Sequence, residues 1–103
     1  MEDVMIVVRN LFRIKFGQSK PAVAAFKEGR ALIKKLGLNA ESRLLTDLVG
    51  TSYTIVHELQ FEGLAAFEQE MKKVTGSAEW RAWYETFIPY AESGSREIFN
   101  VVE

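Results

Sequence analysis

The sequence predicts an α+β fold, with a four-stranded antiparallel sheet covered by helices on one face. Three observations support this fold class. Residues 53–61 alternate between apolar and polar side chains at period two, which is typical of a half-buried strand. Residues 21–36 carry an apolar stripe at helical spacing. The aromatic residues of 80–87 recur at intervals of three and four, which indicates a further helix.

The composition is that of one globular domain, which we predict to span residues 1–103. The chain has 48% hydrophobic and 26% charged residues, and a chain of this length buries roughly 65% of its unfolded surface. Its net charge of −1 gives no basis for binding nucleic acid or an anionic membrane. No apolar run approaches the roughly 20 residues that a membrane-spanning helix requires.

The chain contains no cysteine. Disulfides, thiolate metal sites and a cysteine nucleophile are therefore excluded, and a cytoplasmic location is expected. The N-terminus begins Met-Glu-Asp without a basic segment or an apolar one, so no signal peptide is predicted.

The first strand is predicted from Val4 to about Lys15. It begins with a short apolar run and then alternates between two faces. One face carries Val8, Asn10, Phe12 and Ile14, and the other carries Val7, Arg9, Leu11 and Arg13.

The first helix is predicted from Pro21 to Leu36, with Ser19 as its N-cap and Gly37 as its C-terminal stop. Gly29 lies inside this helix, where glycine costs about 1 kcal/mol relative to alanine. Either this cost is tolerated, or the missing side chain lets the helix approach the sheet closely.

The remaining elements follow in order. Residues 43–49 form the second strand, and Gly50-Thr51-Ser52 joins it to the strand 53–61 as a hairpin. Helical segments are predicted at 63–73 and 78–88, and Pro89 ends the second. A loop at 93–95 then precedes the last strand, 97–102.

This order, β-α-β-β-α-β, is that of the ferredoxin-like fold. The first and third strands are neighbours in that fold, so we expect Asn10 and Phe12 to lie under the helices beside the apolar face of 53–61. The opposite face mixes charged and apolar side chains, which is more typical of a subunit interface than of open water. We therefore predict a homodimer, or a higher oligomer, with an interface that includes Val7, Arg9, Leu11, Val56 and Glu58.

Three segments, 13–17, 58–67 and 79–99, resemble small NIPSNAP-like members of the dimeric α/β-barrel superfamily. The resemblance implies that two ferredoxin-like subunits pack sheet to sheet. In the oxygenases of that superfamily the pocket lies between sheet and helices, lined by an Asn on the first strand and an aromatic residue at the end of the third. Asn10 and Phe61 match these positions.

The resemblance also bears on cofactors. Heme-degrading members have a Trp where Phe61 stands and a metal-ligating His on the second helix. None of the predicted helical segments contains a histidine, so heme is not expected and no cofactor is predicted. A cofactor-independent monooxygenase of an aromatic or quinol-type substrate remains compatible with the sequence.

His57 is the only histidine, and it lies in the middle of the predicted third strand on the apolar face. It could act as a general base, proton shuttle or substrate anchor in a pocket with Asn10 and Tyr53. Alternatively, it is a structural histidine bonded to a backbone group or to Asn10. Since no second histidine or carboxylate cluster accompanies it, no metal site is predicted.

The aromatic stripe of 80–87 either roofs a pocket or belongs to the core. If there is a pocket, its predicted walls are Tyr53, Phe61, Trp80 and Trp83.

Arg9 and Glu58 share one face and could pair at the interface or be solvated separately. The exposed face of the third strand, Thr54, Val56, Glu58 and Gln60, offers no aromatic platform for RNA, so nucleic acid is not expected as a partner.

Three functions remain open. The chain is a NIPSNAP-like protein with a small-molecule pocket, a cofactor-independent monooxygenase, or a binding module whose pocket positions are packed. A cavity of about 300 Å³ or more that His57 reaches would favour a small apolar or aromatic ligand.

Overall fold

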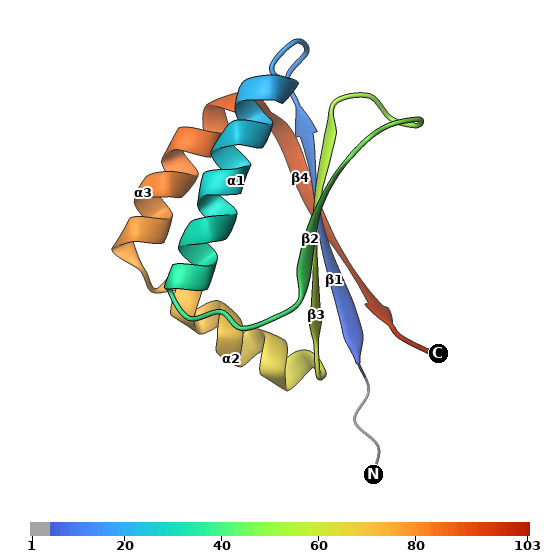
Figure 1. The fold of residues 1–103 in the computed structure, drawn as a ribbon, viewed down its shortest axis with the longest axis vertical. Coiled ribbons are helices and arrows are strands. Elements are labelled where there is room, and N and C mark those ends of the chain that lie inside the picture. The colour runs from blue at the N-terminus through green and yellow to red at the C-terminus, as the bar shows by residue number, and fades with distance from the viewer. Residues whose placement is uncertain (1–4) are drawn as a thin grey trace.

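The computed structural model describes residues 5–103 (Figure 1). Within these residues, no helix has both the length and the apolar character needed to cross a membrane. The elements in chain order are β1 (Ile6–Ile14), α1 (Ser19–Lys35), β2 (Ser42–Thr46), β3 (Thr54–Phe61), α2 (Leu64–Thr75), α3 (Ala78–Phe87), the 3₁₀ turn η1 (Ile88–Tyr90) and β4 (Ala91–Asn100).

The four strands form one antiparallel sheet in the order β2-β3-β1-β4. Figure 1 shows α1, α2 and α3 on one side of this sheet, and no helix on the other side. The predicted α+β, ferredoxin-like arrangement is confirmed, with the second helical region divided into α2 and α3. The outer strands β2 and β4 leave one backbone edge each without a partner strand.

Strand register decides which side chains face the helices. Asn10 pairs with His57 on β3 and with Arg96 on β4, while Phe12 pairs with Ile55. Because side chains opposite each other in a sheet share a face, these residues lie together under the helices. The predicted placement of Asn10 and Phe12 on the covered face is therefore confirmed.

Several element boundaries differ from the prediction. Helix α1 begins at Ser19 and its N-cap is Gln18, so Ser19 is not the cap. Strand β2 ends at Thr46, three residues earlier than predicted, which makes the hairpin loop longer. In that loop the Asp47 carboxylate accepts a hydrogen bond from the Thr54 amide at 2.8 Å. Val4 lies outside the described residues.

The predicted loop at 93–95 is wrong, because these residues lie inside β4 and pair with β1. Ser-Gly-Ser reads locally as a turn, but the pairing with a neighbouring strand overrides this preference. Gly94 lies opposite Phe12, and a Cβ atom there would be only 3.2 Å from Phe12 Cδ1. The glycine therefore leaves room for the Phe12 ring beside β4.

The core contains two clusters of buried residues between sheet and helices. One lies toward α2 and includes Val8, Leu59, Phe61 and Phe67. The other joins the sheet to α1 and α3 and includes Ile14, Ile55, Phe26, Trp83 and Phe87.

Gly29 marks the closest approach of α1 and α3. A Cβ atom there would lie 2.2 Å from Trp83 Cζ2, closer than atoms can approach. Trp83 Nε1 also donates a hydrogen bond to the Ala25 carbonyl oxygen at 2.9 Å. The missing side chain therefore lets α1 approach the Trp83 ring of α3, and not the sheet as one prediction held.

Replacing Gly29 by alanine tests this contact. Alanine would gain about 1 kcal/mol of helix propensity at an open site. Here we expect Gly29→Ala to lower the free energy of unfolding by about 2 kcal/mol, because its methyl group overlaps the Trp83 ring. Urea denaturation measures the change. In a Trp83→Phe background the same substitution is expected to be neutral or stabilising, and an equal cost in both backgrounds would contradict the contact.

Candidate functional site

A cavity of about 480 Å³ lies between the covered face of the sheet and the helices. It exceeds the roughly 300 Å³ at which small-molecule pockets begin. Its polar lining groups include His57, Asn10 and Arg96, from the three strands β3, β1 and β4. The aromatic lining consists of Phe12, Phe26, Trp80, Trp83 and Tyr84.

The three polar residues form one row across the sheet. Asn10 stands opposite His57 on one side and opposite Arg96 on the other. Arg96 Nε donates a hydrogen bond of 2.7 Å to Asn10 Oδ1. The central strand therefore links a buried imidazole to a more exposed guanidinium along a single face.

His57 is buried, with 3% of its surface exposed. Its Nε2 atom has no hydrogen-bond partner within residues 5–103, and the ring packs edge-on to Phe26 with 5.2 Å between centroids. Burial, and to a lesser extent the positive charge of Arg30, lower the pKa of His57 from 6.5 to about 4. The imidazole is therefore neutral at pH 7, and its Nε2 atom is buried without a partner.

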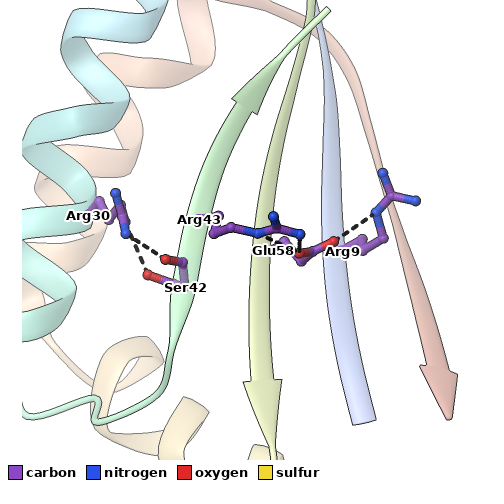
Figure 2. A network of polar contacts seen from close by, with 5 residues as sticks. All are labelled: Arg9, Arg30, Ser42, Arg43 and Glu58. Atoms are coloured by element: carbon purple, nitrogen blue, oxygen red, sulfur yellow. Dashed lines mark hydrogen bonds and ion pairs between the residues drawn. The ribbon is translucent and has the colours of Figure 1, made fainter. Parts of the chain in front are cut away.

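Arg30 itself is fixed between helix and sheet. Its Nη2 donates to the Ser42 carbonyl oxygen at 2.7 Å and its Nε donates to Ser42 Oγ at 3.1 Å (Figure 2). This tether holds the α1 guanidinium beside the start of β2, on the helix side of the sheet. The charge that disfavours protonation of His57 is thus a fixed part of the structure.

The aromatic stripe of α3 serves both roles that the sequence left open. Phe87 and Trp83 are buried in the core and stack with 5.6 Å between ring centroids. Trp80 lies against Trp83 at 4.8 Å and faces the cavity, as Tyr84 does. The stripe is core on the side of the sheet and a cavity wall on the side of α2.

Two predicted walls lie elsewhere. Phe61 packs against Phe67 in the core with 5.2 Å between ring centroids. Tyr53 precedes the first residue of β3 and contacts Phe16, with 5.1 Å between their ring centroids. Neither lines the cavity beside His57. Each is four residues from His57, which is about 13 Å along a strand. Of the predicted site residues, the structure brings together Asn10, His57, Trp80 and Trp83.

Arg96 and Tyr84 line the cavity but were not among the predicted site residues. Arg96 was missed because the sequence placed it just before the last strand, whereas β4 carries it opposite Asn10. Tyr84 had been recognised only as part of the aromatic stripe. Within residues 5–103, no three potential metal-ligating side chains lie close enough together to hold a metal ion.

The uncovered face of the sheet carries a second polar row, one residue out of step with the first. Arg43, Glu58, Arg9 and Glu97 stand side by side on β2, β3, β1 and β4, so their charges alternate in sign. Arg43 Nε donates to Glu58 Oε2 at 3.0 Å, and Arg9 Nε lies 3.6 Å from Glu58 Oε1 (Figure 2). Of the two alternatives that the sequence left open, the Arg9–Glu58 pair forms, within a single chain.

The pH dependence of stability tests the state of His57. Because the pKa of His57 is lowered in the folded state, the unfolded chain binds the proton first as the pH falls. The contribution of neutral His57 to the free energy of unfolding is therefore complete above pH 6.5 and is lost as the pH falls toward 4. From the two pKa values, His57 should remove about 2 kcal/mol of stability between pH 7 and pH 5.

The measurement is the free energy of unfolding in urea at both pH values, for the wild type and for His57→Gln. The variant lacks the titrating group but shares every other one, so the difference between the two proteins isolates His57. Equal pH dependence in both proteins would show that His57 titrates normally in the folded state.

Comparison with known proteins adds the fold family. No protein-family model matches the sequence, and no curated protein matches it either. Solved structures do match. A NIPSNAP family protein from Agrobacterium tumefaciens is 19% identical with a TM-score of 0.84, covering 100% of this chain and 90% of that one. An uncharacterised NIPSNAP domain protein from Burkholderia xenovorans is 18% identical with a TM-score of 0.82, covering 91% of each chain.

A more distant match is SnoaB, a cofactor-independent oxygenase from Streptomyces nogalater. It is 12% identical with a TM-score of 0.72, and the match covers 99% of this chain and 96% of that one. Identities this low establish the fold and not the activity. The chain therefore shares the fold of these NIPSNAP family structures, as the sequence resemblance predicted.

Proposed function

We propose that this protein is a NIPSNAP-like small-molecule binder whose ligand is a planar aromatic compound held between sheet and helices. The observation that carries the proposal is the 480 Å³ cavity lined in part by His57, whose buried Nε2 has no hydrogen-bond partner within residues 5–103. Trp80 and Trp83 supply flat apolar surfaces, and Asn10 supplies a polar anchor on the sheet.

The energetics of burial support a ligand here. A buried polar atom without a hydrogen bond costs about 1–3 kcal/mol. A ligand that bonds to Nε2 would offset this cost. The alternative of a binding module whose pocket positions are packed is less well supported, since Asn10, Trp80 and Trp83 line an open space of about 480 Å³.

A second candidate function is a cofactor-independent monooxygenase acting on an aromatic or quinol-type substrate. Two observations support it. SnoaB, a cofactor-independent oxygenase, has a similar fold, and a neutral imidazole lies opposite Asn10 in the cavity lining. His57 would accept the proton of a ring hydroxyl, and Asn10 would hold the neighbouring oxygen. No residue of this chain needs to bind a cofactor in this scheme. We also propose a cytoplasmic location for the protein, with which its lack of cysteine agrees.

Tryptophan fluorescence tests ligand binding directly, because Trp80 and Trp83 are the only tryptophans and both line the cavity. Titration with a panel of aromatic and quinol compounds should give saturable quenching for at least one of them. His57→Ala should weaken that binding about tenfold, as expected when one buried hydrogen bond is lost.

Tyr53→Phe is the matched control, since Tyr53 lies outside the cavity and should leave binding unchanged. No response across the panel would eliminate the pocket proposal. Oxygen uptake with a bound quinol, present in the wild type and lost in His57→Ala, would favour the monooxygenase over simple binding.

We also propose that the protein forms a homodimer through the uncovered face of the sheet. Phe99 is 48% exposed and pairs with Val7 on that face. Arg9 Nε is buried there and lies 3.6 Å from Glu58 Oε1, but it forms no hydrogen bond within residues 5–103. Val56 is already buried in a single chain, with only 7% of its surface exposed, because its neighbours Leu11 and Leu45 cover it in part. A second sheet would cover the apolar side chains and offer Arg9 an acceptor.

Light scattering at micromolar concentration should return twice the 11.7 kDa mass of the chain. Leu11→Glu should shift the mass to that of one chain, because it places a carboxylate in the apolar part of the proposed interface. Lys34→Glu, on the exposed surface of α1, is the control and should remain dimeric. A wild type with the mass of one chain would contradict the homodimer.

A further inference from the structure

Charge is distributed unevenly around the cavity. Among the described residues that line it, Arg96 is the only one with an ionised side chain at neutral pH, and no Asp or Glu is present. The cavity therefore has a single positive charge and no negative charge to balance it. A cationic ligand would meet repulsion there, whereas an anionic one would be attracted.

The Arg96 guanidinium is held in place on one side and open on the other. Its Nε donates to Asn10 Oδ1 at 2.7 Å, and its Cζ lies 5.2 Å from the centroid of the Phe67 ring. Its two terminal nitrogens form no hydrogen bond or ion pair with residues 5–103. In contrast, Arg30 and Arg43 both place a terminal nitrogen on an acceptor of the protein.

The amide of Asn10 has its orientation set by the same contact. A guanidinium can only donate, so the atom that faces Arg96 must be Oδ1. The NH₂ group of Asn10 is then turned away from Arg96, and it donates to no residue within 5–103. The row thus presents donors from Arg96 and Asn10, together with the neutral imidazole of His57.

We infer that the ligand is an aromatic anion, and that the terminal nitrogens of Arg96 bind its carboxylate or ionised ring oxygen. The planar pair of guanidinium N–H groups matches the two oxygens of a carboxylate, and the Asn10 NH₂ group adds a third donor. The ring of the ligand then lies against Trp80 and Trp83, and His57 reaches its far edge. This inference rests on the proposed aromatic ligand and specifies its charge.

The test compares two probes of equal size, 2-naphthoate and 2-naphthamide, which differ in charge and not in ring. Isothermal titration calorimetry of the wild type should show 2-naphthoate binding about ten- to a hundredfold tighter, as expected for charge-assisted hydrogen bonds. Equal affinity for the two probes would overturn the inference and leave the aromatic pocket intact. Failure of both probes to bind would overturn both proposals.

Three variants locate the effect. Arg96→Gln, which retains an N–H donor toward Asn10, should reduce the preference for 2-naphthoate to about twofold or less, mainly by weakening the binding of 2-naphthoate. Arg96→Lys should keep part of the preference, because it keeps the charge without the planar pair of donors. Arg81→Gln, an exposed residue of α3 outside the cavity lining, should keep all of it.

Retention of the full preference in Arg96→Gln would assign the charge selectivity to another group and overturn the role of Arg96. Thermal unfolding of each variant, measured beside the titration, shows whether its fold is retained. If Arg96→Gln does not fold, the comparison of the two probes on the wild type decides whether the ligand is anionic, and Arg96→Lys decides whether the guanidinium binds it.

Discussion

The pairing of β1 with both of its neighbours is the constraint on which both surfaces of the sheet depend. Asn10 pairs at once with His57 and with Arg96, and the adjacent Arg9 pairs with Glu58 and Glu97. Two polar rows thus lie back to back, one residue apart. A slip of β1 by one residue would turn Arg9 toward the helices and Asn10 toward the open face. The apolar side chains beside each row make such a slip costly.

On the helix side, the cavity exists because large rings surround a row of polar residues without filling the space above it. Trp83 is fixed by its hydrogen bond to Ala25, and the absence of a side chain at Gly29 lets it lie close to α1. Its position in turn sets that of Trp80 at 4.8 Å. The wall of the site is therefore as rigid as the contact between α1 and α3, even though its residues come from distant parts of the chain.

Much of this architecture could be predicted from the sequence, because period-two alternation in β1 and β3 assigns each residue to a face. That pattern placed Asn10 and His57 together under the helices. It could not place Tyr53, which precedes β3, or Phe61, which shares the face but lies about 13 Å along the strand from His57. Nor could it find Arg96, because the Ser-Gly-Ser segment favours a turn locally and only pairing with β1 makes it a strand. Cavity volume depends on how rings pack, and no periodicity encodes it.

Strand β4 has a wider consequence as a ten-residue outer edge of the sheet. Nearly all of it is exposed, so its outward backbone groups could template cross-β growth of one molecule on another. Glu92, Arg96 and Glu97 place charges along this edge, and Gly94 lowers its intrinsic tendency to extend a sheet. Substitutions that would make this strand a better β former are therefore expected to make it more prone to fibril formation as well.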